Sequence, residues 1–233
     1  APEGRAGFIR IDSVHQGDFD GAKGVYHINA VDCVTQFELV ASCERISEAY
    51  LLPVLACLLQ DFPFTILGCH ADNGSEYINH TVAKLLGKLH IELTKSRPRT
   101  SNDNALAETK NAAIVRKHLG YAHIPQRCAS AVNAFCREFL NPYVNFHRPC
   151  FFAQMVTDSK GKIRKRYRFE DMMTPYEKLK SLPNAKDFLK SGMRFAALDA
   201  YVAATSDNQA ARDMNAARTK LFQSIQPRSI QAA

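Results

Sequence analysis

The sequence lacks the features of membrane proteins and of secreted, disulfide-bonded proteins. No run approaches the roughly 18 uninterrupted apolar residues of a membrane-spanning helix, and no charged-then-apolar leader opens the chain. The 7 cysteines form an odd set without a Cys-x-x-Cys pair, and most lie among apolar neighbours, as Cys57 does. We therefore expect reduced core thiols and a soluble, cytoplasmic protein with no membrane partner.

Several common functional motifs are also missing. The chain contains no phosphate-cradling glycine loop, no zinc-binding spacing and no nucleophile elbow. It starts at Ala1, without Met, a few residues before its first expected strand. This start predicts that the chain is a piece of a longer protein.

Positive charge is concentrated at one end of the chain. The net charge of +7 and the pI near 9.1 suit a polyanionic partner. Residues 1–150 contain 15 Lys and Arg against 15 Asp and Glu, whereas residues 151–233 contain 15 against 8. The whole excess therefore lies in the last third, where the segment 160–168 carries six bases.

Hydrophobic periodicity predicts alternating strands and helices over the first 148 residues. Apolar runs predict five strands, at 8–14, 25–31, 37–43, 64–69 and 91–94. A glycine-rich turn is expected at 16–24, and helices are expected at 47–60, 77–89, 105–119 and 126–143. This order predicts an α/β domain, with a mixed five-stranded sheet flanked by helices, over residues 1–148. A basic linker at 149–183 and a C-terminal helical region at 184–233 complete the expected organisation.

Three carboxylates occupy positions that suit metal binding. Asp12 lies within an apolar strand, Asp72 directly follows another apolar strand, and Glu108 lies on a helix after a polar loop. Phosphoryl transfer between DNA strands uses hard cations, which prefer carboxylate oxygens. Each acid also has a structural interpretation: an edge-strand charge for Asp12, a turn residue for Asp72 and a solvated helix position for Glu108.

The spacing of these acids resembles that of a known family. Residues 70–77 read HADNGSEY, similar to the H-S-D-N-G-x-E-F segment of integrase-type transposases, and 35 residues separate Asp72 from Glu108, as in the D,D-35-E signature. Residues 96–111 read SRPRTSNDNALAETKN and resemble the S-R-P-Y-x-x-N-D-N-x-x-V-E-x-K-N stretch of bacterial insertion-sequence transposases. Segments near 145, 165 and 174 also resemble that group, so the resemblance covers residues 8–180.

The resemblance implies a ribonuclease-H-like fold and a metal-dependent enzyme that cuts and joins DNA at transposon ends. Asp12, Asp72 and Glu108 would then be catalytic and hold two Mg²⁺ or Mn²⁺ ions. Asp32 is the rival first acid, and Asp103 is expected to cap the helix that carries Glu108. The resemblance also implies a bacterial, nucleoid-associated protein that acts as a multimer, so DNA and further copies of the chain are the expected partners.

DNA contacts cannot be carried over from retroviral integrases, because lysines that follow their glutamate are replaced here by Ala112 and Val115. The expected contacts are basic residues of three segments: Lys95, Arg97, Arg99, Arg116, Lys160, Lys162, Arg164, Lys165, Arg166 and Arg168. Supporting roles at the site are expected for His70, Asn73 and Asn111.

Two other functions share these sequence features. A ribonuclease-H-like nuclease without joining activity would use the same acids, and an assay would be needed to tell it apart. A non-catalytic DNA-binding or assembly protein would keep the fold but lose an acid, and none of the three acids is lost.

Overall fold

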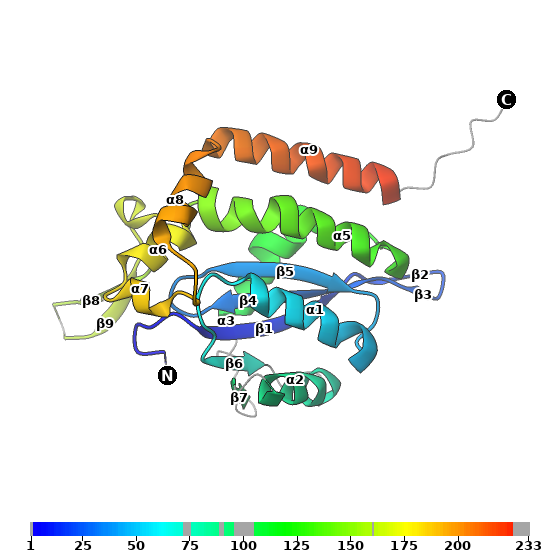
Figure 1. Ribbon diagram of the computed structural model, residues 1–233, viewed down its shortest axis with the longest axis horizontal. Helices are drawn as coiled ribbons and strands as arrows, with labels where there is room; N and C mark the ends of the chain where they lie inside the picture. The colour runs from blue at the N-terminus through cyan, green and yellow to red at the C-terminus, as the bar shows by residue number, and fades with distance from the viewer. Residues whose placement is uncertain (1, 72–75, 89–90, 96–104, 160, 226–233) are drawn as a thin grey trace.

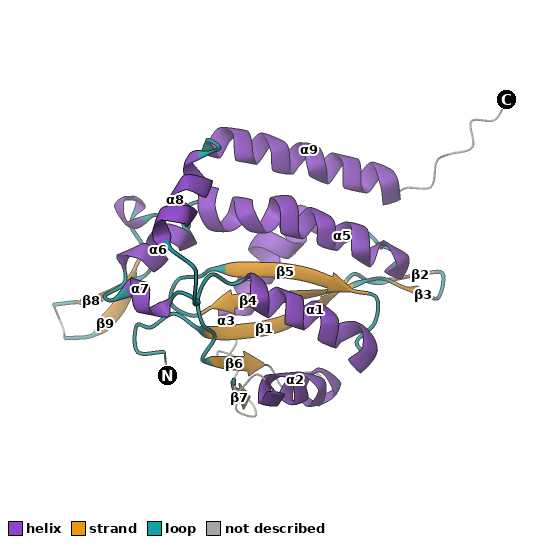
Figure 2. Ribbon diagram, in the orientation of Figure 1, coloured by secondary structure: helices purple, strands orange, loops and turns teal. Residues whose placement is uncertain are grey.

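The computed structural model describes residues 2–71, 76–88, 91–95, 105–159 and 161–225. A five-stranded sheet lies at its centre, with helices on both faces (Figure 2). The strands of this sheet are β1 (Phe8–His15), β4 (Tyr26–Asp32), β5 (Glu38–Cys43), β6 (Gly68–Ala71) and β7 (Glu92–Lys95). The turn predicted at 16–24 contains a small separate hairpin of β2 (Asp18–Phe19) and β3 (Ala22–Lys23).

The strand order is β5-β4-β1-β6-β7. β1 pairs antiparallel with β4, and β4 pairs antiparallel with β5, whereas β1, β6 and β7 run parallel. Three antiparallel strands joined in sequence need short turns, while the parallel strands need helical crossovers, which α1 (Glu48–Asp61) and α2 (Glu76–Lys88) provide. The predicted ribonuclease-H-like mixed sheet is confirmed.

Each strand sends alternate side chains to opposite faces of the sheet. Ile9 and Ile11 face a core that is completed by α1 and α2, with Leu51 and Leu86 fully buried there. Val14, two residues after Asp12, faces a second core on the opposite side. Asp12 therefore points to the face that the later helices cover.

The helix predicted at 105–119 is one continuous run with a wide middle turn. It begins as α3 (Ala105–Lys110), passes through the π-helical segment η1 (Asn111–Arg116) and ends as α4 (Lys117–Leu119). Ile114 and Val115 pack into the second core. The next run likewise combines η2 (Gln126–Cys128), α5 (Ala129–Phe135) and the π-helical segments η3 (Cys136–Leu140) and η4 (Tyr143–His147). π-Helical turns are often found at functional sites.

Strand β6 begins at Gly68, not at Phe64 as the apolar run predicted. The reason is tertiary: the Phe64 ring packs against Phe37 and Phe62, with ring centroids 5.8 and 5.4 Å away. The following backbone amides of Leu67 and Gly68 both donate to the carbonyl of Gly7. Burying the aromatic ring thus takes precedence over extending the strand.

Three asparagines on the helical run close the exposed edge of β5. Each side-chain amide accepts a hydrogen bond from a backbone N–H and donates one to the carbonyl of the same residue. The pairs are Asn133 with Ser42, Asn141 with Val40 and Asn145 with Glu38. An open edge would offer these groups to another chain, so the asparagines replace a sixth strand.

The C-terminal third packs on the same body. It contains the hairpin of β8 (Gln154–Thr157) and β9 (Ile163–Arg166), followed by η5 (Phe169–Asp171), α6 (Pro175–Ser181), α7 (Ala185–Phe188), α8 (Phe195–Ala203) and α9 (Asp207–Ile225). Leu179 of α6 joins the first core, while Met214 and Leu221 of α9 join the second. α9 lies along α5, and the β8–β9 hairpin projects at the opposite end of the molecule from β2–β3 (Figure 1). The boundaries expected at 148 and 183 remain predictions.

None of the helices in the described part of the chain combines the length and the hydropathy that crossing a bilayer requires.

Candidate active site

Asp12 is held in place by two hydrogen bonds from its surroundings. The backbone N–H of Ser13 donates to Oδ1 at 2.8 Å, and the Asn111 side chain donates to Oδ2 at 2.6 Å. Asn111 in turn accepts a hydrogen bond of 2.9 Å from the side chain of Asn29, which is paired with Asp12 across β1 and β4. The Asn29–Asn111–Asp12 chain therefore ties two strands and the first residue of η1 into one unit.

Glu108 comes to the same region through helix geometry. It precedes Asn111 by three residues, and side chains three apart on a helix are neighbours on one face. Ala107 and Lys110 are buried against the sheet, whereas Glu108 is exposed. The contact between Asn111 and Asp12 thus places the Glu108 side of α3 beside Asp12, with its carboxylate open to solvent.

The third predicted acid, Asp72, lies outside the described residues. β6 ends at Ala71, which is in parallel register with Ile11 of β1. Among the described residues alone, no group of three or more His, Cys, Asp or Glu side chains is arranged to hold a metal ion. The structure therefore brings together Asp12, Asn111 and the Glu108 side of α3.

Asp32, the rival first acid, is fully buried and surrounded by donors. Its carboxylate accepts hydrogen bonds from the backbone N–H groups of Gly7, Val34 and Thr35, and from the Thr35 hydroxyl. Burial raises the pKa of Asp32, while these four donors oppose the rise. Such an arrangement links the segment before β1 to the turn after β4, which is a structural role. Asp12 remains the predicted first catalytic acid.

A buried ion pair next to the site was not foreseen. Glu38 of β5 is 1% exposed, and its Oε2 lies 3.7 Å from Nζ of Lys110, whose side chain is also buried. Burial raises the pKa of Glu38 to about 7, and the positive charges of Lys110 and Arg148 oppose the rise. The sequence signal was a charged residue inside an apolar strand, the same signal that singled out Asp12.

The raised pKa of Glu38 predicts a pH-dependent stability. Because the folded state binds this proton more tightly than the unfolded state, the stabilisation is present below about pH 4.5 and lost as pH rises through about 7. Glu38→Gln removes the titration. The free energy of unfolding of the variant, relative to the parent, should therefore rise by about 2–3 kcal/mol between about pH 5 and pH 8, as measured by urea denaturation. A difference independent of pH would contradict the shift.

The other predicted site residues have diverse surroundings. His70 pairs with Arg10 across β1 and β6, and its Nδ1 lies 2.9 Å from the hydroxyl of Thr94. Arg116 donates from Nη2 to the carbonyl of His15 and from Nη1 to the side chain of Gln16, so its guanidinium also supports the end of β1. Lys95 ends β7. The remaining predicted residues of this region lie outside the described residues: Asn73, Arg97, Arg99 and Asp103.

The predicted basic segment forms much of the β8–β9 hairpin, and all four residues of β9 are exposed. Two of its arginines have acidic partners: Arg164 Nε lies 2.9 Å from Asp158, and Arg168 Nη1 lies 2.9 Å from Glu170. Lys162, Lys165 and Arg166 are exposed as well, and Lys160 lies outside the described residues.

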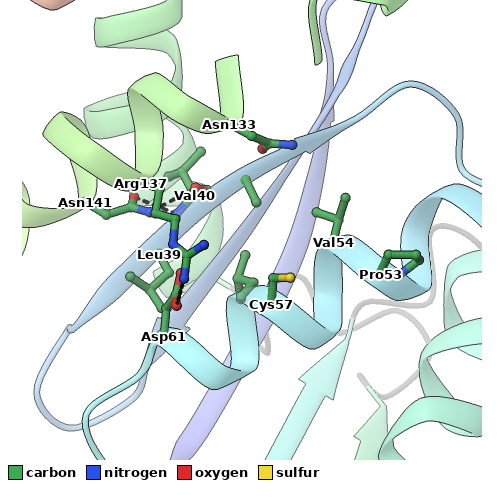
Figure 3. Close-up of a pocket in the computed structure, with 11 residues that line it drawn as sticks. Leu39, Val40, Pro53, Val54, Cys57, Asp61, Asn133, Arg137 and Asn141 are labelled. Carbon is green, nitrogen blue, oxygen red and sulfur yellow. Dashed lines mark hydrogen bonds and ion pairs between the residues drawn. The ribbon is translucent and has the colours of Figure 1, made fainter. Parts of the chain in front are cut away.

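An apolar cavity of about 260 Å³ lies elsewhere, between β5, α1 and the α5–η3 run (Figure 3). Leu39, Val54 and Cys57 line it, and the ion pair of Arg137 with Asp61, 2.9 Å long, lies at its side. None of the predicted catalytic residues lines this cavity.

Comparison with known proteins gives distant similarities. No family model matches the chain. Uncharacterized protein y4rM of Sinorhizobium fredii is 27% identical over 162 residues, which cover 69% of this chain and 46% of that protein, so the chain spans less than half of this relative. The chain is also similar to the catalytic core domain of BIV integrase, with a TM-score of 0.46, 18% identity and coverage of 73% of this chain and 91% of that one.

A second similar structure is the simian T-cell lymphotropic virus intasome in complex with PP2A regulatory subunit B56 gamma. Here the TM-score is 0.48 with 14% identity, over 79% of this chain and 57% of that one. The strand order and directions described above define the fold class of the present chain.

Proposed function

We propose that this chain is the catalytic core of a DNA transposase or integrase that cleaves and joins DNA strands at transposon ends. The observation that carries the proposal is the hydrogen bond from Asn111 to Asp12, which joins the helical run that bears Glu108 to strand β1 of a ribonuclease-H-like sheet. The spacing of Asp72 and Glu108 in the sequence supports it. As in the family that the sequence resembles, the working form would contain several copies of the chain.

The donor set suits hard divalent cations. Asp12, Asp72 and Glu108 supply carboxylate oxygens, which Mg²⁺ and Mn²⁺ prefer. The Asp12 carboxylate already receives hydrogen bonds from Ser13 and Asn111, which fix its orientation. Two bound ions would activate the attacking oxygen and stabilise the leaving oxygen of the phosphodiester.

Other residues position the acids and admit the DNA substrate. Asn111 is a positioning residue, because its amide holds Asp12 and is itself held by Asn29. The exposed Glu108 leaves the site open to a bulky substrate such as a DNA strand. The basic β8–β9 hairpin offers phosphate contacts, and the excess of positive charge lies in residues 151–233, because residues 1–150 carry no net charge.

An assay on labelled DNA duplexes that carry the element ends tests the proposal. We expect nicking and strand joining with Mg²⁺ or Mn²⁺, and loss of both in excess chelator. Ca²⁺ should support DNA binding without chemistry, because its looser coordination fits an in-line reaction poorly. Full activity in excess chelator would exclude this mechanism, while nicking without joining would favour the nuclease alternative.

A further inference from the structure

A group of exposed aromatic rings flanks the two ends of the β8–β9 hairpin, next to its basic strand β9. Phe151, Tyr167 and Phe169 are 39%, 57% and 84% exposed, respectively. The Phe151 ring centroid lies 6.5 Å from that of Tyr167 and 5.4 Å from that of Phe169. We call these three residues the aromatic cluster. Large apolar rings gathered at the surface mark a contact site, because leaving them in water is unfavourable.

The aromatic cluster rests on an ordered base. The amide of Cys150 donates to the carbonyl of Met173 at 2.9 Å, and the side chain of Gln36 donates to the carbonyl of Phe151 at 2.8 Å. Phe152, next along the chain, is buried, with Nζ of Lys178 5.4 Å from the centre of its ring. The segment that bears Phe151 is therefore held by contacts with the turn before β5 and with α6.

The positive charge around the aromatic cluster favours a nucleic acid over a neutral protein surface as its binding partner. Residues 151–171 contain six Lys and Arg against three Asp and Glu. Arg166 lies directly before Tyr167, and Lys165 and Arg166 point to opposite faces of the exposed β9. A neutral protein surface would gain little from these bases, whereas a nucleic acid backbone complements them.

We propose that the aromatic cluster and the basic strand β9 together bind a single-stranded segment of DNA. This inference rests on the proposed function in taking DNA as the partner. In a duplex the faces of the bases are covered by their neighbours, so exposed protein rings can stack on a base only where the strand is unpaired. Because Lys165 and Arg166 point to opposite faces of β9, one of the two contacts the phosphates of the same strand, and Phe169, the most exposed ring, carries most of the stacking.

The test measures binding of the whole chain to a labelled oligo(dT) and to a duplex of the same length, without divalent metal. Phe169→Ala should weaken oligo(dT) binding about tenfold and duplex binding less than about twofold. The reason is that an unpaired base can stack on the Phe169 ring, whereas a base inside a duplex cannot. The slope of log affinity against log salt should stay unchanged in this variant. Replacing both Lys165 and Arg166 with Ala should instead flatten the slope for oligo(dT) by about 0.7, the value for one phosphate contact on a single strand.

Phe19 on the β2–β3 hairpin provides a matched control, since it is 63% exposed and belongs to the other projecting hairpin. Phe19→Ala should leave both affinities unchanged. The chain contains no tryptophan, so Phe169→Trp introduces a single tryptophan at the aromatic cluster, whose emission can be excited selectively at wavelengths that tyrosine does not absorb. Its emission should be quenched when oligo(dT) binds, whereas that of Phe19→Trp should not.

Three results would overturn the inference. These are equal oligo(dT) affinity for Phe169→Ala and its parent, unquenched emission of Phe169→Trp, or dissociation of a dimer by Phe169→Ala without a change in oligo(dT) binding. The last result would make the aromatic cluster an interface between copies. Absence of metal-dependent cleavage, with the stacking results as expected, would refute the proposed function and leave the single-strand site in place.

Discussion

Asp12→Asn should reduce DNA cleavage and joining on the order of a thousandfold or more, while DNA affinity changes little. The substitution keeps the shape of the side chain and removes a negative charge that would hold a metal ion, and such an ion contributes several kcal/mol to stabilising the transition state. Glu108→Gln and Asp72→Asn should have the same effect. Single-turnover cleavage and a binding measurement in Ca²⁺ would separate the two quantities.

Asn111→Ala should reduce DNA cleavage less than the loss of one of the three acids does. It removes the 2.6 Å hydrogen bond to Asp12 but leaves all three acids, so activity should fall about 10–100-fold, as is typical when a partner of a metal ligand is lost. The lost activity should be partly recovered at higher metal concentration. Wild-type cleavage by Asp12→Asn would refute the assignment of this acid.

Asp32→Ala should instead destabilise the fold, by at least about 3 kcal/mol, because it leaves several buried donors without an acceptor. Asp32→Asn should be milder, since one acceptor oxygen remains. Urea denaturation measures both effects. The DNA cleavage rate per folded molecule should stay near the wild-type value in Asp32→Asn.

Asp18→Ala serves as the control for Asp32. Asp18 is an exposed acid on β2, and its ion pair with His15 is 3.4 Å long. Its replacement should change the free energy of unfolding by less than about 0.5 kcal/mol. A well-folded but inactive Asp32→Asn would make Asp32 the first catalytic acid and return Asp12 to a structural role.

Much of the local structure could be predicted from the chain. The strands β1, β4 and β5 and the helices α1 and α2 lie within a residue or two of the predicted ranges, because hydrophobic alternation and helical periodicity are local signals. The mixed sheet followed from the order of these elements. Asp12 also stood out, since an ionised group in an apolar strand needs a partner, whereas Asp72 and Glu108 stood out by their spacing.

The local pattern could not separate Asp12 from Asp32, and only the family resemblance favoured Asp12. Both are aspartates in apolar strands, and their surroundings differ through contacts with distant residues: Asn111 is 99 residues from Asp12, and Gly7 is 25 residues from Asp32. The same holds for Glu38, whose partner Lys110 comes from another part of the chain. The hydrophobic pattern shows which charged side chains will need a partner after burial, but it does not show which residue that partner is.

Local sequence therefore set the strands, the helices and the set of candidate acids. The tertiary structure decided where β6 begins, which aspartate meets α3, and which side chains close the edge of β5. These outcomes depend on packing and hydrogen bonding between segments far apart in the chain, and a buried polar group takes whichever partner the completed fold brings to it. Local periodicity carries no information about that choice.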